Sequence, residues 1–342
     1  MNNLPDIKVA GQLKNVLLSI YDQSRSLYQQ LLIEQKPIAP EEINTDTHIL
    51  IEANICRLHL GKLISNFRIY KVYELFVLTD SPDYNGSDRV WYLLEDESLL
   101  FAANIPDCTG KKVLDIGSGS GVLAIMAARN HADSVKSIDI SPRATYISGF
   151  NAAINQITNI EFITVSLNDF NTGAKFDYIT FNPPFVPLPD HTNYMLSGSG
   201  GRDGLALVHQ LLAVMDRLAH PSTALSLISL SPGDEHISLL ERLLISKYYG
   251  KSVTITSTDV YGEVAPIEII YKPFEQESFF DDWKNWLASQ NYTNMHYLFI
   301  NIFPASRYQF QRIQQFPLLE DLPESGTWGA MYRVIQNSKS HA

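Results

Sequence analysis

The segment Asn-Pro-Pro-Phe at positions 182–185 has the composition of a rigid hydrogen-bond acceptor. The side-chain oxygen of Asn182 and the carbonyl oxygen of Pro183 can each accept a hydrogen bond, and the proline rings hold the backbone still. The ring of Phe185 offers a flat face for a planar group. Amide and aromatic amine nitrogens are weak nucleophiles because their lone pairs are delocalised, and preorganised acceptors for their N–H groups return electron density to nitrogen. The segment therefore predicts a site for a planar nitrogen; a plain proline-rich strand exit is the alternative.

A glycine-rich turn lies upstream, in LDIGSGSG (114–121). Its glycines, Gly117, Gly119 and Gly121, allow a ligand to lie against the backbone, and the amides that open the following helix are free donors. Such a turn also occurs in plain strand–helix connections and in dinucleotide sites, so it is weak evidence when taken alone.

A carboxylate, Asp139, ends the next expected strand, in SIDISP (137–142). A carboxylate in this position can accept hydrogen bonds from both hydroxyls of a ribose. Helix capping is the other role open to it, but Ser141, directly before Pro142, already provides a cap. The turn and Asp139 together therefore strengthen the prediction of a cofactor site.

Alternating strands and helices position these residues. We expect strands at 112–117, 135–140, 160–165, 176–181 and 224–230, and helices at 121–131, 141–154, 203–219 (capped by Asp203) and 235–246. After residue 250 the strand candidates are 252–258, 267–272, 297–303 and 328–336, two of them as an antiparallel edge pair, with a helix near 278–289. This alternation predicts an α/β fold with a parallel sheet that is covered on both faces.

The N-terminal part has a different pattern. Residues 1–75 carry apolar residues at helical spacing and are interpreted as a helical domain. Residues 76–110 contain two apolar runs around the turn-rich segment 81–88, which predicts a hairpin and linker. Residues 111–342 then form the α/β domain with a C-terminal extension.

Three segments, VLDIGSGSGVLAI (113–125), SIDISP and FDYITFNPPF (176–185), together resemble class I S-adenosylmethionine-dependent methyltransferases. The resemblance implies a Rossmann-like fold with a seven-stranded, mostly parallel sheet, S-adenosylmethionine as the methyl donor and S-adenosylhomocysteine as a product. Carried over to this chain, the cofactor-binding residues are Asp115, Gly117, Gly119, Gly121, Asp139, Ser166, Leu167 and Asn182, and the catalytic residues are Asn182, Pro183 and Phe185. Many relatives have Asp at the position of Ser166, so Asn168 or Asp169 could make the adenine contact instead.

Two further segments narrow the resemblance to HemK-type release-factor glutamine methyltransferases. LEDESLL (94–100) is similar to their E-D-T-x-L-L segment, with Glu97 in place of Thr, and GSGGRDG (198–204) is similar to a G-G-x-[DN]-G loop that opens a helix. A flexible lid is the alternative for this loop. The resemblance implies that the acceptor is a protein glutamine side chain and that residues 1–75 help to recognise the substrate.

Other classes of methyl acceptor are alternatives to a glutamine side chain. The chain has 26 Lys and Arg against 37 Asp and Glu, and a net charge of −11 disfavours general polyanion binding. Residues 53–73 nevertheless hold a local basic stretch without acidic residues: Arg57, His59, Lys62, Arg68 and Lys71. An RNA base (adenine N6 or guanine N2) and a small-molecule amine or amide are therefore alternative acceptors, and a donor-binding module without turnover is a further alternative.

The remaining composition predicts a cytoplasmic protein. Two cysteines, Cys56 and Cys108, have no metal-like spacing, and the nine histidines form no paired motif, so we expect no metal. The N-terminus does not resemble a signal peptide, and no apolar window approaches the length of a membrane span. His191, near the acceptor segment, could touch a substrate, although a solvated loop histidine is the plainer interpretation.

Overall fold

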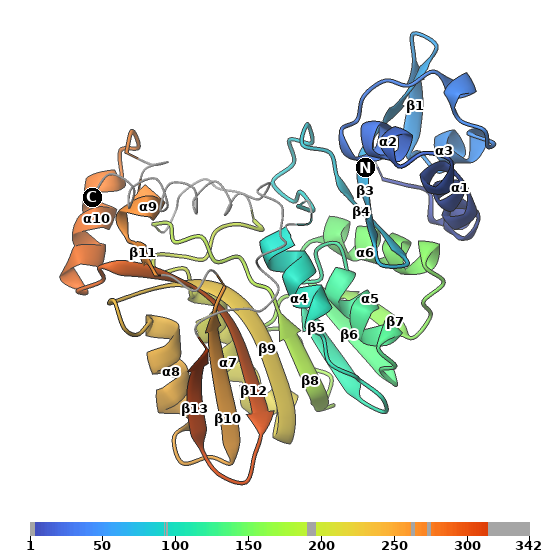
Figure 1. Ribbon diagram of the computed structural model, residues 1–342. Helices are drawn as coiled ribbons and strands as arrows, with labels where there is room; N and C mark the ends of the chain where they lie inside the picture. Colours follow the sequence, from blue (N-terminus) through green and yellow to red (C-terminus); the bar gives the residue numbers. More distant parts are fainter. Residues whose placement is uncertain are drawn as a thin grey trace. The chain divides into compact units, whose positions relative to one another are not determined.

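The computed structural model describes residues 4–91, 93, 95–189, 196–260, 264–271 and 275–313 (Figure 1). The chain divides into two compact units. Unit 1 contains Met1–Leu93, Ile105–Gly110 and Gly117–Ser166, and unit 2 contains Leu94–Asn104, Lys111–Ile116 and Leu167–Ala342. This division does not follow the expected boundaries at residues 75 and 110.

Unit 1 begins with short helices and two antiparallel hairpins. The helices are η1 (Ile7–Val9), α1 (Ala10–Gln23), α2 (Arg25–Tyr28), η2 (Gln29–Ile33), η3 (Pro40–Glu42) and α3 (His48–Glu52). The hairpins pair β1 (Cys56–His59) with β2 (Lys62–Ser65) and β3 (Phe67–Val72) with β4 (Leu75–Asp80). The expectation of helix throughout residues 1–75 is wrong for 56–72. Leu60 and Gly61 both have positive φ, which reverses the chain in a tight turn that no helix can contain.

The elements that follow the glycine-rich turn complete unit 1. They are α5 (Val122–Arg129), β6 (Ser134–Asp139), α6 (Pro142–Ile154) and β7 (Ile160–Thr164), as expected from the sequence, and β6 pairs with β7 in parallel. Ser141 caps α6 by accepting a hydrogen bond from the Ala144 N–H. A single apolar core joins α6 to the N-terminal elements, and it includes Leu13, Leu17, Phe76, Ile147 and Phe150. The N-terminal elements are therefore packed on the helix that follows Asp139.

Unit 2 is built on a twisted sheet with the strand order β5–β8–β9–β12–β10–β13. Its strands are β5 (Lys112–Ile116), β8 (Phe176–Phe181), β9 (Ala219–Gly233), β10 (Val253–Asp259), β11 (Ala265–Pro266), β12 (Asn294–Pro304) and β13 (Gln309–Ile313). β8 is parallel to β5 and β9, whereas β12 is antiparallel to β9 and β10, which confirms the expected antiparallel pair. The Rossmann-like α/β class is thus confirmed, and within the described residues β11 and β13 bring the α/β strands to nine rather than seven.

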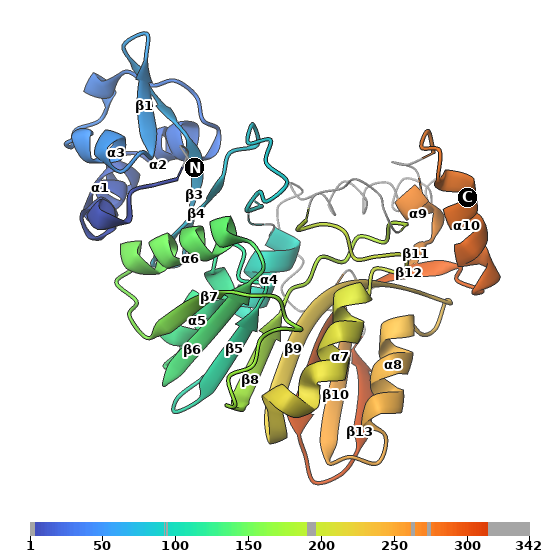
Figure 2. The same ribbon diagram turned by 180° about the vertical axis from the view of Figure 1, so that it is seen from behind.

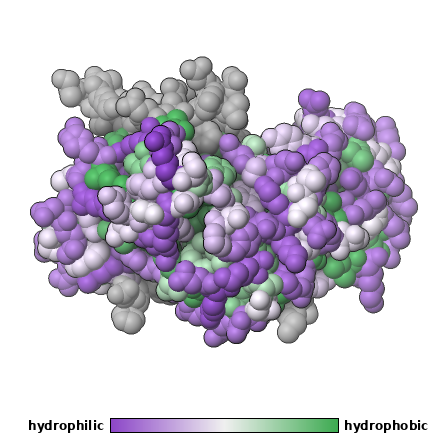
Figure 3. Space-filling model, turned by 90° about the horizontal axis from the view of Figure 1, so that it is seen from below, coloured by the Kyte–Doolittle hydropathy of each residue, from purple (hydrophilic) through white to green (hydrophobic). Residues whose placement is uncertain are grey.

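The described part of unit 2 also contains helices. They are η4 (Glu95–Leu99), α4 (Leu100–Ala103), α7 (Ala206–Leu218), α8 (Leu239–Tyr248), α9 (Glu268–Tyr271) and α10 (Phe280–Ser289). Figure 2 shows α7 and α8 on one face of the unit 2 sheet, and both contact β9. In the view of Figure 3, hydrophilic side chains cover most of the surface and apolar ones are scattered between them. Among the described helices, none is long and apolar enough to cross a membrane.

Three element predictions are corrected by the structure. Part of 267–272 forms helix α9 instead of a strand. α7 begins at Ala206 rather than at 203, because Gly204 adopts a φ of +80° and interrupts the helix there. Asp203 is consequently not the cap residue, and its carboxylate accepts from the Leu205 N–H. The strand candidate at 328–336 lies outside the described residues.

Candidate active site

The glycine loop of unit 1 is held open at one position and closely packed at another. Gly119 has a φ of +51°, and the nearest atom to a Cβ placed there lies 4.0 Å away, which leaves space for a ligand along the backbone. Gly121 has a φ of +78°, and a Cβ there would lie 2.7 Å from the Ser148 Cβ. Glycine is therefore required at 121 for packing, whereas at 119 it leaves an open face.

Asp139 lies directly beside this loop. Its Oδ2 accepts from the Gly119 N–H at 3.0 Å and its Oδ1 accepts from the Ser141 N–H at 2.8 Å. Burial raises the pKa of Asp139, and the backbone N–H groups of Gly119 and Ser141 partly oppose that rise. The Ile140 N–H also bonds to this carboxylate, which has about four acceptor positions in all, so Asp139 can still accept from a ribose hydroxyl.

Ser118, inside the loop, was not predicted as a site residue. Its hydroxyl is buried and has no hydrogen-bond partner among the residues that the structure describes. A buried hydroxyl without a partner carries a desolvation cost that a bound ligand can remove. This orphaned group and the open backbone at Gly119 both fit a polar cofactor.

Three other residues predicted to bind the cofactor are Asp115, Ser166 and Leu167. Asp115 is buried in β5, and its Oδ1 accepts from the Thr180 hydroxyl at 2.7 Å. Ser166 is half-buried after β7. Leu167 is buried, and its carbonyl accepts from Arg217 at 3.4 Å. The roles expected for Asp115, Ser166 and Leu167 stay predictions.

The Asn-Pro-Pro-Phe segment at 182–185, called the acceptor segment below, lies in unit 2, where Asn182 follows β8. Its amide nitrogen donates to the Glu97 Oε1 at 2.9 Å. An ionised carboxylate can only accept, so Glu97 determines which end of the Asn182 amide faces it. The other end, Oδ1, is buried without a partner among the described residues. Asn182 therefore holds an oriented and unused acceptor oxygen.

The rest of the segment is fixed by the loop at 198–204. Val186 exchanges backbone hydrogen bonds with this loop, donating to Gly198 at 2.9 Å and accepting from Gly200 at 2.8 Å. A Cβ at Gly200 would lie 2.7 Å from the Phe185 Cα, and one at Gly204 would lie 2.6 Å from the Phe185 carbonyl oxygen. The glycines of this loop are thus needed because its backbone packs directly on the segment.

Phe185 and Pro183 are both buried. Phe185 is 6% exposed, and its ring lies 5.9 Å from the Tyr297 ring, centroid to centroid. Its expected stacking on a substrate, like the expected role of the Pro183 carbonyl, stays a prediction. His191 lies outside the described residues.

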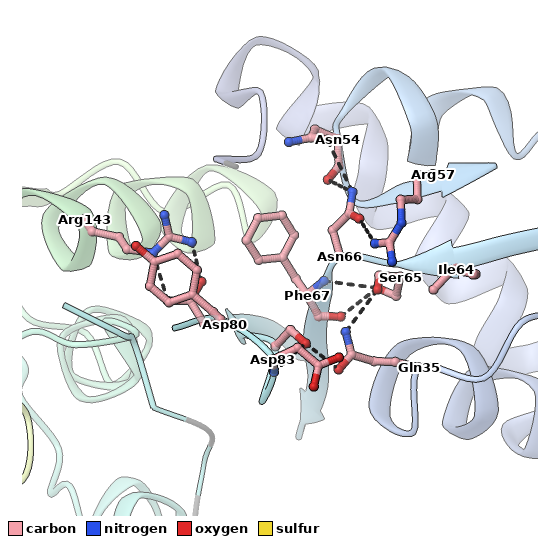
Figure 4. A pocket seen from close by; sticks show the side chains of 12 residues that line it. Gln35, Asn54, Arg57, Ile64, Ser65, Asn66, Phe67, Asp80, Asp83 and Arg143 are labelled. Atoms are coloured by element: carbon pink, nitrogen blue, oxygen red, sulfur yellow. Dashed lines mark hydrogen bonds and ion pairs between the residues drawn. The ribbon is translucent and has the colours of Figure 1, made fainter. Parts of the chain in front are cut away.

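A separate cavity of about 420 Å³ lies within unit 1 (Figure 4). Its walls include Arg57 of the basic stretch, which donates to Asn66, and Gln35, which donates to the Ser65 carbonyl at 3.0 Å. Arg143 and Asp80 form a buried ion pair on another wall. None of the residues predicted for the cofactor or acceptor sites lines this cavity.

Comparisons with known proteins agree with the sequence resemblance. Residues 92–196 match the family model for the methyltransferase small domain. The chain is 33% identical over 123 residues to a Methanocaldococcus jannaschii protein that is provisionally named a protein N5-glutamine methyltransferase, covering 34% of this chain and 60% of that one. It is 33% identical over 178 residues to the release factor glutamine methyltransferase of Lactococcus lactis subsp. lactis, covering 50% and 64%.

The similarity extends to enzymes with other acceptors. The chain is 34% identical over 110 residues to a ubiquinone biosynthesis O-methyltransferase of Neisseria meningitidis serogroup C, covering 32% of this chain and 46% of that one. In all three comparisons the chain spans less than two thirds of the relative's length. The match of residues 92–196 to this family model and the similarity to these relatives confirm the resemblance to class I S-adenosylmethionine-dependent methyltransferases.

Proposed function

We propose that this protein is an S-adenosylmethionine-dependent N-methyltransferase that methylates a planar nitrogen, with a protein glutamine side chain as the acceptor. The observation that carries the proposal is the buried, unpartnered Oδ1 of Asn182, whose amide nitrogen is held by Glu97. In the reaction, the acceptor nitrogen forms a bond to the methyl carbon while the carbon–sulfur bond breaks. S-adenosylhomocysteine leaves as a neutral thioether, and the acceptor nitrogen sheds one proton.

The donor side of the proposal uses the residues predicted to bind the cofactor. S-adenosylmethionine supplies a methyl group made electrophilic by its sulfonium charge. Asp139 accepts from the ribose hydroxyls, the open backbone at Gly119 lies along the donor, and the orphaned Ser118 hydroxyl gains a partner. Ser166 and Leu167 are proposed to line the adenine, and Asp115 is proposed as a further cofactor-binding residue.

The acceptor side uses two oxygens. Asn182 Oδ1 and the Pro183 carbonyl each accept a hydrogen bond from one of the two N–H groups of the methyl acceptor. These hydrogen bonds return electron density to its nitrogen. Both acceptors are fixed before the substrate arrives, Asn182 by Glu97 and Pro183 by its ring, so little reorganisation is needed. Phe185 is proposed to contact the plane of the acceptor group. The names of the glutamine methyltransferases among the relatives support a glutamine amide.

A nucleic-acid base is the second candidate acceptor. The observation that favours it is the basic stretch of unit 1, in which Arg57, His59 and Lys62 are exposed on the β1–β2 hairpin. To separate the candidates, the enzyme is incubated with radiolabelled donor and cell extract. Loss of label on protease treatment supports a protein acceptor. Loss on RNase treatment supports RNA, and label that passes a size filter supports a metabolite.

Paired substitutions test the two sides separately. Asn182→Ala should lower kcat by about 10²–10³-fold, the usual effect of removing one preorganised group that stabilises the transition state. Its affinity for S-adenosylmethionine, measured by calorimetry, should stay within twofold of wild type. Asp139→Ala should instead weaken donor binding at least tenfold. Unchanged turnover in Asn182→Ala would contradict the acceptor role, and unchanged affinity in Asp139→Ala would contradict the ribose role.

A further inference from the structure

Helix α6 and the residue that follows it, Asn155, present three buried polar side chains to strand β4, all within unit 1. Arg143 pairs with Asp80, its Nε donating to Asp80 Oδ2 at 2.9 Å, as Figure 4 shows. Asn151 accepts from the Leu78 N–H and donates to the Leu78 carbonyl, both at 2.8 Å. Asn155 makes the same pair of bonds to Phe76, at 2.9 and 2.7 Å. The two amides thus satisfy the strand edge as a neighbouring strand would.

The two asparagines differ in their third hydrogen bond. The second N–H of the Asn155 amide stays within the helix and donates to the Asn151 carbonyl at 2.8 Å. The second N–H of the Asn151 amide leaves the helix and donates to the Ser120 carbonyl, also at 2.8 Å. Ser120 lies in the glycine loop, between Gly119 and Gly121. Asn155 therefore bonds only to the strand and to its own helix, whereas Asn151 bonds to both the strand and the glycine loop.

This contact holds the carbonyl end of a peptide plane in the glycine loop. The plane between Ser120 and Gly121 adjoins a glycine that adopts a φ of +78°, a region that residues with a side chain rarely enter. Its carbonyl is held by Asn151, and its N–H donates to the Ser118 carbonyl at 2.6 Å. With both ends fixed, the open face at Gly119 and the Gly119 N–H bond to Asp139 keep one geometry.

We propose that Asn151 is a positioning residue for the methyl donor: it fixes the glycine loop in its binding conformation. The proposal rests on the proposed function, because it takes S-adenosylmethionine as the ligand of this loop. Asn151 does not touch the donor. It lowers the conformational entropy that the loop loses on binding, so its loss weakens affinity.

Asn155 provides a matched control for the test. Asn151→Ala and Asn155→Ala each remove one buried amide and leave one residue of β4 without its two side-chain partners. Both should lower the thermal midpoint by comparable amounts. Calorimetry with S-adenosylmethionine should show at least a fivefold loss of affinity in Asn151→Ala and less than a twofold change in Asn155→Ala. Equal affinities in the two variants would overturn the proposal.

Wild-type amide exchange covers the case in which Asn151→Ala does not fold. Saturating donor should slow exchange of the Leu78 N–H at least fivefold more than exchange of the Phe76 N–H, because only the first is bonded to the side chain that braces the loop. Equal slowing would count against the proposal. A wild-type chain that binds no S-adenosylmethionine would instead refute the proposed function, so the two failures are distinguishable.

Discussion

A single carboxylate, Glu97, determines which atom Asn182 offers. If the Asn182 amide were turned around, its oxygen would face the Glu97 oxygen and its N–H groups would take the place of the free acceptor. At the 2.9 Å separation found here, two oxygens without a proton between them repel each other. Glu97 therefore keeps Oδ1 available, and it does so where the HemK-type segment has Thr.

This residue-scale argument predicts the behaviour of two Glu97 variants. Glu97→Ala should lower kcat about tenfold, because the Asn182 amide can then rotate away from its productive orientation. Glu97→Gln should keep most of the activity, because its amide oxygen can still accept from Asn182. Steady-state kinetics measure both, and calorimetry should find unchanged donor affinity. A normal kcat in Glu97→Ala would refute the orienting role, and a weakened donor affinity would indicate a cofactor contact instead.

At the scale of elements, the acceptor segment depends on the loop that packs over it. Gly204→Ala would place a Cβ 2.6 Å from the Phe185 carbonyl oxygen, a backbone atom that cannot move without shifting the segment. We expect turnover to fall at least tenfold while donor binding persists, together with a loss of folding stability of roughly 1–3 kcal/mol from the clash and the positive φ. Activity assays and urea unfolding measure the two effects.

The control for this element-scale prediction is Gly173→Ala. Gly173 also has a positive φ, +67°, but no atom lies within 4 Å of a Cβ placed there. It should therefore lose stability through backbone strain alone and keep its turnover. If both variants lost activity equally, the packing of the loop on Phe185 would not matter to catalysis.

At the scale of elements, many of the helices and strands can be predicted from the sequence alone. The strands and helices at 112–181 were predicted to within a few residues because each has a clear apolar period and a local boundary signal, such as Ser141 before Pro142. The β1–β2 hairpin was missed because its apolar spacing also fits a helix and its turn, Leu60–Gly61, has leucine before the glycine instead of the usual Asn or Asp. Asn182 was predicted from its own motif.

Partners that are distant in sequence could not be predicted in this way. Glu97 lies 85 residues from Asn182, and Asn151 lies 73 residues from Leu78. No local pattern joins such pairs, since only the folded chain brings them together. One signal was present in the sequence, however: Asn151 and Asn155 are polar residues four apart on a largely apolar helix, a spacing that places both on one face.

At the scale of the whole molecule, folding stability should depend on a buried histidine. His296 in β12 is fully buried, with its Nε2 2.7 Å from the Asp234 carbonyl and its Nδ1 2.8 Å from an Arg312 nitrogen. Because Arg312 can only donate, Nδ1 must be unprotonated, and the proton is assigned to Nε2. Glu241 also lies near, 3.7 Å from Arg312 Nε, but it is already bonded to Ser238 and Ser257. The neutral ring is therefore fully satisfied.

Protonation of His296 would break this arrangement. Burial, assisted by the charge of Arg312, lowers the pKa of His296 below its usual value, although the bond to Asp234 and the charge of Glu241 oppose the shift. Below about pH 6.5 the unfolded chain then binds a proton that the folded chain does not, so stability falls as pH drops, until the lowered pKa is reached. The slope can reach about 1.4 kcal/mol per pH unit.

Urea unfolding between pH 7.5 and 5 should show this loss in wild type, whereas His296→Asn should be less stable at pH 7.5 but lose less on acidification. His59→Gln, at an exposed position of β1, should keep the wild-type slope. If His296→Asn kept that slope as well, the acid sensitivity would have to reside in other groups.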